Sequence, residues 1–219
     1  MQLLTLPSAV PDGIEVWLLP LNLQAPLHHA DLSILSDSER MHATSLHFHE
    51  DRVRSVATRA ALRRLLAPQV MSTPEALLFA TNAYGKPFLQ SNTHIEFNVS
   101  HAGSFALIAT SKERCVGVDI ECTNRSIDVN SLARYVFSPL ERRCARKTQQ
   151  AFMRRWVAKE SALKALGIGI SEHLQTISII SGNNTDYHIV CDDPSWPELK
   201  GWLIALPTND YLAALTVQY

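Results

Sequence analysis

Three acidic side chains and one lysine have the spacing of a cation site. Asp119 and Glu121 lie two residues apart in Cys115–Glu121, whose alternating apolar residues predict a β-strand. Both carboxylates are then on one strand face, about 7 Å apart, and can converge on one cation. Glu160 and Lys164 lie one turn apart in a predicted helix. Carboxylates bind Mg²⁺ and ammonium offsets phosphate charge, so the set indicates a Mg²⁺-bound polyphosphate.

Each of these pairs also has an ordinary structural interpretation. An Asp-x-Glu sequence can be a solvated strand edge, and a Glu–Lys pair can be a surface helix pair worth about 0.2–0.5 kcal/mol. A third segment, FNVSHAG (97–103), favours the functional interpretation. It predicts a strand that ends in Ser100 and His101 before a turn of small residues. A hydroxyl, an imidazole and turn N–H groups can together bind phosphate.

Other polar residues in the N-terminal part are weaker candidates. His42, His47 and His49 do not share one helix face, so we interpret them as surface histidines rather than metal ligands. Most arginines between 52 and 64 are predicted to be solvated, and one or two of them match phosphate geometry. Lys86 lies at the tip of a turn, where it is either solvated or directed at an anion.

The predicted elements alternate between strands and helices. Helices are expected over 40–67, with a break near 47–51, and over 129–167, with a helix start at Ser138. The three strands between 95 and 121 are expected to form a β-meander. The predicted strands are 14–19, 76–81, 95–99, 105–110, 115–121, 176–180, 187–190, 202–206 and 212–217.

The composition is that of an ordinary globular protein. The 219 residues are 46 % hydrophobic and 19 % charged, with a net charge of −1. This balance does not indicate nucleic-acid binding, and no apolar run has the length of a membrane span. The start of the chain lacks the basic region of a signal peptide, and the four scattered cysteines predict reduced thiols. We therefore expect a cytoplasmic protein.

The order of elements suggests two similar units in tandem. Each half of the chain runs from a strand through helices to several further strands, with no linker between them. The seam is predicted between Thr110 and Cys115. We expect an α+β fold with an N-terminal half over 1–112 and a C-terminal half over 113–219.

The three motifs FNVSHAG, GVDIE and WVAKESALK, in this order and spacing, resemble those of Sfp-type 4′-phosphopantetheinyl transferases. SERMHATSLHFHEDRVRS and YGKP are similar to the N-terminal half of that family, so the resemblance covers residues 36–166 motif by motif and the rest of the chain by the order of its elements. It implies a monomer of two pseudo-symmetric α/β halves with the active site in the cleft between them. The implied reaction is Mg²⁺-dependent transfer of 4′-phosphopantetheine from coenzyme A to a serine of an apo acyl or peptidyl carrier protein, which releases 3′,5′-ADP.

The resemblance also implies roles for individual residues. Asp119, Glu121 and Glu160 would be the Mg²⁺ ligands. Glu160 is the first candidate for the base that takes the serine proton, Glu141 is the second, and Lys164 would offset the charge of the leaving group. The positions that match coenzyme A contacts are Arg40, Arg54, Lys86, Ser100, His101 and Lys164. Trp156 is expected to pack and fix the helix that carries Glu160.

Two positions depart from the family pattern. His42 stands where Arg or Lys is frequent and Ser45 where Arg is frequent, which bears on how tightly the 3′-phosphate is held. Residues 123–150 are the candidate surface for the carrier protein. Two other functions are compatible with the motifs: a non-catalytic coenzyme A or carrier-binding module, and a Mg²⁺-dependent pyrophosphohydrolase that uses water in place of serine.

Overall fold

The computed structural model describes the whole chain except residues 92–93, 125, 145–147 and 183–184. The strands are β1 Gln2–Leu3, β2 Ile14–Pro20, β3 Phe79–Thr81, β4 Pro87–Leu89, β5 Glu96–Ala102, β6 Phe105–Ser111, β7 Val116–Cys122, β8 Ile177–Ser181, β9 Asp186–Cys191, β10 Leu199–Ile204 and β11 Tyr211–Gln218. The α-helices are α1 His29–Leu32, α2 Asp37–Ser45, α3 His49–Leu66, α4 Val129–Val136, α5 Pro139–Cys144, α6 Gln149–Leu166 and α7 Ile170–His173, and a 3₁₀ helix η1 spans Ala67–Val70.

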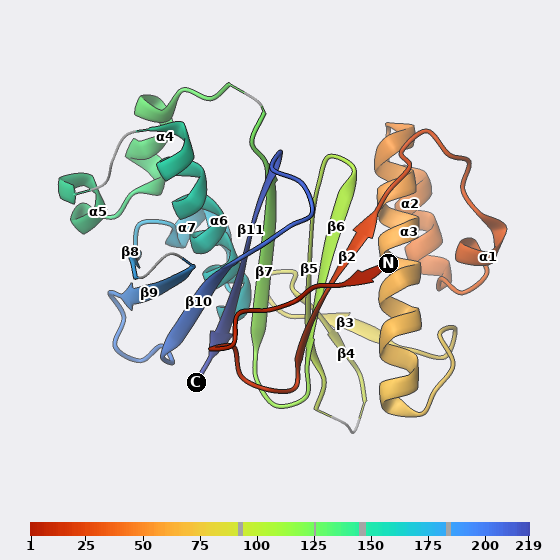
Figure 1. Ribbon diagram of the computed structural model, residues 1–219. Coiled ribbons are helices and arrows are strands. Elements are labelled where there is room, and N and C mark those ends of the chain that lie inside the picture. Colours follow the sequence, from red (N-terminus) through yellow and green to blue (C-terminus); the bar gives the residue numbers. More distant parts are fainter. Residues whose placement is uncertain (92–93, 125, 145–147, 183–184) are drawn as a thin grey trace.

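Two antiparallel sheets lie next to each other (Figure 1). The first has the strand order β1-β2-β6-β5 and the second β7-β11-β10-β9-β8, while β3 and β4 form a separate hairpin. The mixture of helices and antiparallel sheets confirms the predicted α+β class. No helix in the described part of the chain is both long enough and apolar enough to cross a membrane.

The long helix α6 covers the second sheet and carries two of the candidate site residues. Its N-terminus is capped by Thr148, whose hydroxyl accepts from Ala151 N, and it ends at Gly167, which has a φ of 72°. The helix passes directly over Gly117 of β7. A Cβ on Gly117 would lie 2.0 Å from the Ser161 carbonyl oxygen. Only glycine permits this approach of helix to strand.

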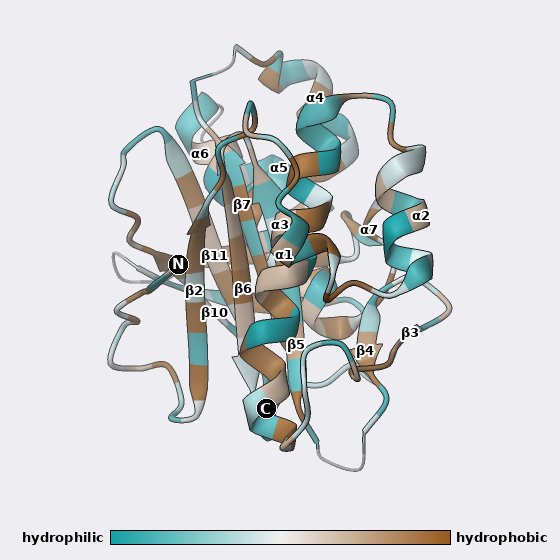
Figure 2. Ribbon diagram, turned by 90° about the vertical axis from the view of Figure 1, so that its right-hand side faces the viewer, coloured by the Kyte–Doolittle hydropathy of each residue, from teal (hydrophilic) through white to brown (hydrophobic). Residues whose placement is uncertain are grey.

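Helix α3 covers the first sheet in the same manner. Its Ala61, Leu62 and Leu66 pack in one cluster with Phe97 of β5 and Ile108 of β6. The strands β2, β6 and β7 are largely hydrophobic, whereas the outer faces of the helices carry polar residues (Figure 2). Each sheet is therefore covered by one 18-residue amphipathic helix.

Strands β5 and β7 form the seam between the sheets. Side chains of β5 bridge the backbones: Val118 N donates to Asn98 Oδ1 at 2.9 Å, and Ile120 N donates to Ser100 Oγ at 3.4 Å. Behind the seam, one core cluster combines apolar side chains of both sheets, including Val16 and Val118. The two sheets therefore share a core.

The predicted β-meander is wrong. Strand β6 is already paired on both edges, with β2 on one side and β5 on the other, so β7 has no edge of β6 to join. Instead, β7 pairs with β11 and begins the second sheet. Local sequence cannot reveal this, because β2, nearly a hundred residues earlier, takes the edge of β6.

Two further boundaries differ from the prediction. The predicted strand over 76–81 begins only at Phe79, because residues 74–76 form a turn. The predicted helical region over 129–167 contains three helices: the predicted start at Ser138 is confirmed, whereas the further start that Thr148 caps was not predicted. The predicted break within 40–67 is confirmed, as α2 ends at Ser45 and α3 begins at His49.

Candidate active site

A compact polar cluster forms where β5, β7 and α6 meet. Asp119 Oδ1 accepts from Ser100 Oγ at 2.8 Å and from Lys164 Nζ at 2.6 Å. Lys164 Nζ also lies 3.1 Å from Ser100 Oγ and 3.5 Å from Glu160 Oε2. Three of the predicted motifs, which are far apart in sequence, thus meet in one cluster.

The cluster carries an excess of buried negative charge. Asp119 is 2 % exposed, and its second oxygen, Oδ2, is buried with no hydrogen-bond partner in the described part of the chain. The pKa of Glu160 is raised to about 7, first by burial and then by the Asp119 carboxylate, while Lys164 opposes the shift. An unpartnered buried carboxylate oxygen, and a carboxyl group whose pKa is raised by a neighbouring carboxylate, are both features that a further cation would stabilise.

Glu121 is held by a tryptophan. The indole Nε1 of Trp156 on α6 donates to Glu121 Oε1 at 3.0 Å. We expected Trp156 to act through packing, and it does stack on Phe152, with ring centroids 6.2 Å apart. Sequence reasoning missed the hydrogen bond. This hydrogen bond could have been predicted, because the indole N–H of a partly buried tryptophan normally donates to an acceptor.

The carboxylates of Asp119, Glu121 and Glu160 have the oxygen ligands that a divalent cation such as Mg²⁺ prefers, and the ammonium group of Lys164 lies among them. No three His, Cys, Asp or Glu side chains within the described ranges are arranged to hold a metal ion as they stand. The ammonium group of Lys164 lies against both Asp119 and Glu160. An all-oxygen donor set with one unpartnered carboxylate oxygen suits Mg²⁺, which would compete with Lys164 for Asp119.

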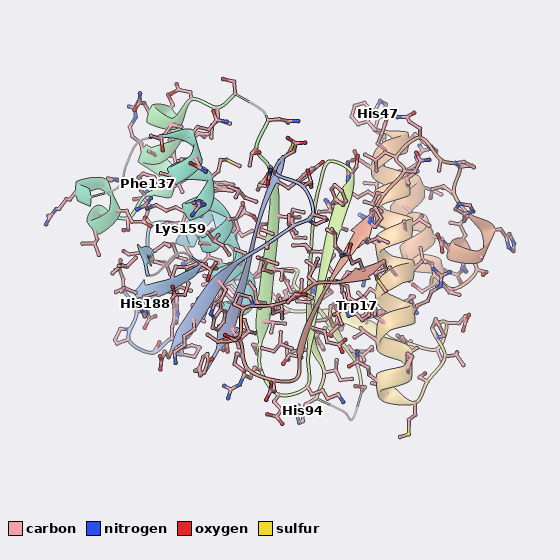
Figure 3. The ribbon with its side chains drawn as sticks, viewed as in Figure 1. Trp17, His47, His94, Phe137, Lys159 and His188 are labelled. Atoms are coloured by element: carbon pink, nitrogen blue, oxygen red, sulfur yellow. The ribbon has the colours of Figure 1, made fainter. Side chains whose placement is uncertain are left out.

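The structure does not bring Glu141 to this cluster. Its carboxylate accepts from Ser138 N and Ile179 N, both at 2.9 Å, and pairs with Lys159 Nζ at 2.7 Å. Glu141 is 3 % exposed, and Lys159 lies within the helical part of the C-terminal half (Figure 3). Both oxygens are used in a buried helix cap and ion pair, so this placement does not favour Glu141 as the base.

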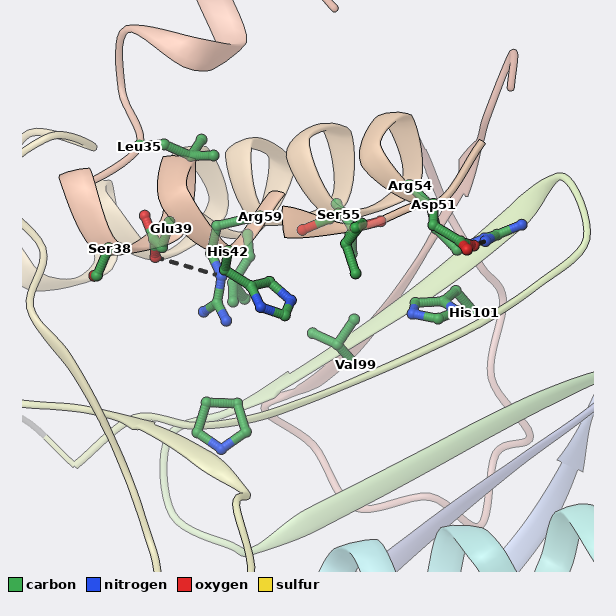
Figure 4. A pocket seen from close by; sticks show the side chains of 14 residues that line it. Leu35, Ser38, Glu39, His42, Asp51, Arg54, Ser55, Arg59, Val99 and His101 are labelled. Carbon is green, nitrogen blue, oxygen red and sulfur yellow. Dashed lines mark hydrogen bonds and ion pairs between the residues drawn. The ribbon is translucent and has the colours of Figure 1, made fainter. Parts of the chain in front are cut away.

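A cavity of about 490 Å³ lies between α2, α3 and β5. Asp51, Arg54 and His101 line one end of it, and Glu39 and Arg59 line the other (Figure 4). Besides burial and Arg54, the positive charge of Lys164 contributes to lowering the pKa of His101, so the first end lies near the acidic cluster. The cavity can therefore receive a ligand whose reacting group lies at that cluster.

At the end near the cluster, the ionic groups neutralise each other. Arg54 forms an ion pair with Asp51 and donates to the Gly103 carbonyl at 3.4 Å. The pKa of His101 is lowered by partial burial and by Arg54. A neutral imidazole at this position can donate a hydrogen bond to a ligand oxygen.

Two predicted coenzyme A contacts lie elsewhere. Lys86 Nζ donates to the carbonyls of Val116, at 3.3 Å, and Ala165, at 3.5 Å, so it ties the β3–β4 turn to the end of α6. Arg40 donates to the Leu32 carbonyl and pairs with Asp37 at 2.5 Å, and it does not line the cavity. In this structure, both side chains hold neighbouring elements together.

Sequence reasoning missed part of the cavity wall. Ser55, Thr58 and Arg59 line the cavity from α3, together with Asp51 and Arg54. The signal was present in the spacing, because these positions recur every three or four residues and so share one helix face. From the sequence alone, this cavity-lining face could not be distinguished from the solvated arginines of the same helix.

Comparison with known proteins gives the family. A model described as the 4′-phosphopantetheinyl transferase superfamily matches residues 115–216, and one described as 4′-phosphopantetheinyl transferase, N-terminal, matches residues 24–113. The 4′-phosphopantetheinyl transferase HetI of Nostoc is 32 % identical over 219 residues, which cover 96 % of this chain and 90 % of HetI. The chain belongs to the 4′-phosphopantetheinyl transferases.

Other members of the family match this phosphopantetheinyl transferase with lower sequence identity and over less of the chain. The Bacillus subtilis enzyme Sfp is 26 % identical over 152 residues, 68 % of this chain and 67 % of Sfp. The L-aminoadipate-semialdehyde dehydrogenase-phosphopantetheinyl transferase of Xenopus laevis is 30 % identical over 148 residues, 59 % of this chain and 48 % of the relative. The resemblance noted in the motifs is confirmed, and the protein is a phosphopantetheine-transferring enzyme.

Proposed function

We propose that this phosphopantetheinyl transferase uses Mg²⁺, bound by Asp119, Glu121 and Glu160, to transfer 4′-phosphopantetheine from coenzyme A to an apo acyl or peptidyl carrier protein. The observation that carries this proposal is the buried acidic cluster, in which Asp119 Oδ2 has no partner in the described ranges. When bound, Mg²⁺ would offset the charge of the coenzyme A pyrophosphate.

The side chains of the cluster then have distinct tasks. The carrier serine hydroxyl attacks the phosphorus that bears the pantetheine group, a new P–O bond forms, and the bond to the other phosphate breaks with release of 3′,5′-ADP. Glu160 takes the serine proton. Lys164 is 19 % exposed at the edge of the cluster and donates to the phosphate oxygens that gain charge.

The remaining residues position the donor and the acids. Arg54 and His101 would contact coenzyme A phosphates at the cavity end beside the cluster. Ser100 is 7 % exposed and bonds to both Asp119 and Lys164, which supports a positioning role rather than contact with phosphate. The carbonyl bonds of Lys86 and Arg40 favour a structural role for these two residues over the coenzyme A contacts that we expected.

We also propose that the enzyme acts as a cytoplasmic monomer whose halves, 1–112 and 113–219, each contain one complete sheet. Within residues 123–150, the exposed apolar side chains of Leu132, Tyr135 and Leu140 support a docking surface for the carrier. The candidate surface includes residues 125 and 145–147, which lie outside the described residues.

The test is the intact mass of an apo acyl and an apo peptidyl carrier after incubation with the protein, coenzyme A and Mg²⁺. We expect one added phosphopantetheine group on at least one carrier, and none when EDTA is present. Glu160→Ala should lower the rate at least about 100-fold, whereas Glu172→Ala, at an exposed position in α7, is the matched control.

Three other outcomes would contradict the proposal in whole or in part. Release of 3′,5′-ADP without any carrier would indicate a pyrophosphohydrolase. Binding of coenzyme A by calorimetry, with no mass gain on either carrier, would indicate a binding module. An Mg²⁺-independent mass gain would contradict the metal assignment alone.

A further inference from the structure

The turn between β3 and β4 belongs to the first half of the chain, yet it contacts the helix that carries Glu160 and Lys164. The amide Nδ2 of Asn82 donates to the carbonyl of Gly167, the residue directly after α6, at 2.7 Å. A Cβ on Gly167 would lie 3.2 Å from the same Nδ2. The turn is therefore packed against the C-terminus of this helix.

The turn also fixes the direction of the Asn82 amide group. Its Oδ1 accepts from the backbone N–H groups of Tyr84 and Lys86, both at 2.9 Å. The backbone N–H of Asn82 donates to the Lys86 carbonyl at 3.0 Å, which closes the turn. Because two N–H groups hold the amide oxygen, the amide plane is fixed and the NH₂ group stays directed at Gly167.

Gly167 connects this contact to the last turn of α6. Its backbone N–H donates to the carbonyls of Leu163, at 2.9 Å, and Lys164, at 3.2 Å. A helix end leaves such carbonyls without a partner inside the helix, so their position depends on the capping residue. Lys164 is therefore bonded directly to the residue that Asn82 holds, and its ammonium group lies 2.6 Å from Asp119.

A second contact of the same turn joins both elements of the acidic cluster. Lys86 Nζ donates to the carbonyls of Val116, at the start of β7, and of Ala165, in the last turn of α6. Val116 precedes Asp119 on the same strand. The helix dipole also favours a positive charge at the C-terminus of α6. The turn thus connects the ends of the two elements whose side chains meet at Asp119.

We propose that Asn82 is a positioning residue, whose bond to Gly167 sets the last turn of α6 and with it the place of the Lys164 ammonium group. The inference rests on the proposed function, in which Lys164 donates to the phosphate oxygens that gain charge. Among the described residues, Asn82 is not part of the cavity wall, so its effect is on the rate and not on the affinity for coenzyme A.

The variant Asn82→Asp isolates this bond. A carboxylate oxygen still accepts from the two N–H groups of the turn, so the turn keeps its shape and Pro87 keeps its place on the cavity wall. No N–H group remains to donate to Gly167. We expect kcat for carrier modification to fall about 5- to 30-fold, while KM for coenzyme A changes less than about threefold. A raised KM with an unchanged kcat would overturn the inference.

Two comparisons separate positioning from a general loss of structure. Asn22→Asp makes the same charge change in another turn, where Asn22 Oδ1 accepts from Gln24 N at 3.3 Å, and should leave kcat and KM unchanged. In a Lys164→Ala background, Asn82→Asp should lower kcat by less than about twofold more, because the group that it positions is already gone. Losses that multiply in the double variant would contradict an effect through Lys164.

Hydrogen exchange separates this inference from the proposed reaction. In Asn82→Asp, the amides of Gly167 and Ile168, which both donate to the Leu163 carbonyl, should exchange at least about tenfold faster than in the wild type. Asn22→Asp should leave them unchanged. This measurement needs neither carrier nor coenzyme A, so it decides whether Asn82 holds α6 even if the wild type modifies no carrier. Unchanged exchange, or faster exchange with an unchanged kcat, would overturn the positioning role.

Discussion

At the scale of single residues, Glu160 shows how the surroundings of a carboxyl group change its pKa. Burial and the Asp119 carboxylate raise its pKa from 4.5 to about 7, and the side chain is 13 % exposed. The folded protein therefore holds the proton at pH values where the unfolded chain has lost it. Stability falls as the pH rises from about 4.5 to about 7, and stays lower above that range.

Replacement of Glu160 by Gln in metal-free protein should remove this pH dependence. A shift from 4.5 to about 7 corresponds to roughly 3 kcal/mol. With EDTA present, we expect Glu160→Gln to be more stable than the wild type at pH 8 by about 1–3 kcal/mol, and equally stable at pH 4.5. Urea unfolding at both pH values is the measurement, with Glu172→Gln as the control. The same difference at both pH values would contradict the assigned pKa.

At the scale of elements, the position of α6 determines the site. The helix carries Trp156, Glu160 and Lys164 on the side that faces β7, so these residues reach the acidic strand only while α6 stays close to Gly117. Ser161, the next residue after Glu160, bonds to the buried hydroxyls of Tyr187 at 3.0 Å and Thr216 at 2.8 Å. This hydroxyl cluster fixes the helix against β9 and β11.

The variant Gly117→Ala should move α6 away from β7. The added methyl group would lie 2.0 Å from Ser161 O and 2.3 Å from Ala165 N, both of which are backbone atoms. We expect a loss of about 1–3 kcal/mol in urea unfolding and at least a tenfold fall in kcat. Gly169→Ala is the matched control, since its nearest neighbour would be 3.4 Å away. An active and stable Gly117→Ala protein would show that the helix position is not critical.

At the scale of the whole molecule, the seam between the sheets creates the site. Asn98 and Ser100 of β5 accept from the backbone of β7, so Asp119 of the second half meets Ser100 of the first. Side chains replace the backbone ladder that would otherwise join two neighbouring strands. The relative register of the halves therefore depends on two polar residues.

Removal of the Asn98 amide should loosen this register. In Asn98→Ala, the buried N–H of Val118 loses its acceptor, which costs about 1–3 kcal/mol. We expect a lower urea midpoint, and also weaker Mn²⁺ binding by the metal-free protein, measured by electron paramagnetic resonance. Asn209→Ala, at an exposed position, is the control. Unchanged stability and unchanged Mn²⁺ binding would contradict a role of the seam.

The sequence by itself determined the elements that have local signals. The strand that carries Asp119, the Ser138 cap and the break before His49 are all present in the structure. These features depend on periodicity and capping, which involve residues close together in the chain. The α+β class and the family follow from the same motifs.

The tertiary structure alone decided which of these residues meet. Glu141 and Glu160 both occur in helical segments, yet one lies in a buried cap with Lys159 and the other beside Asp119. Arg54 and Arg59 share a face of α3, yet Arg54 pairs with Asp51 of the same helix, whereas Arg59 pairs with Glu39 of α2, twenty residues earlier in the chain. Charge compensation and strand pairing depend on residues distant in the chain, so no local pattern contains them.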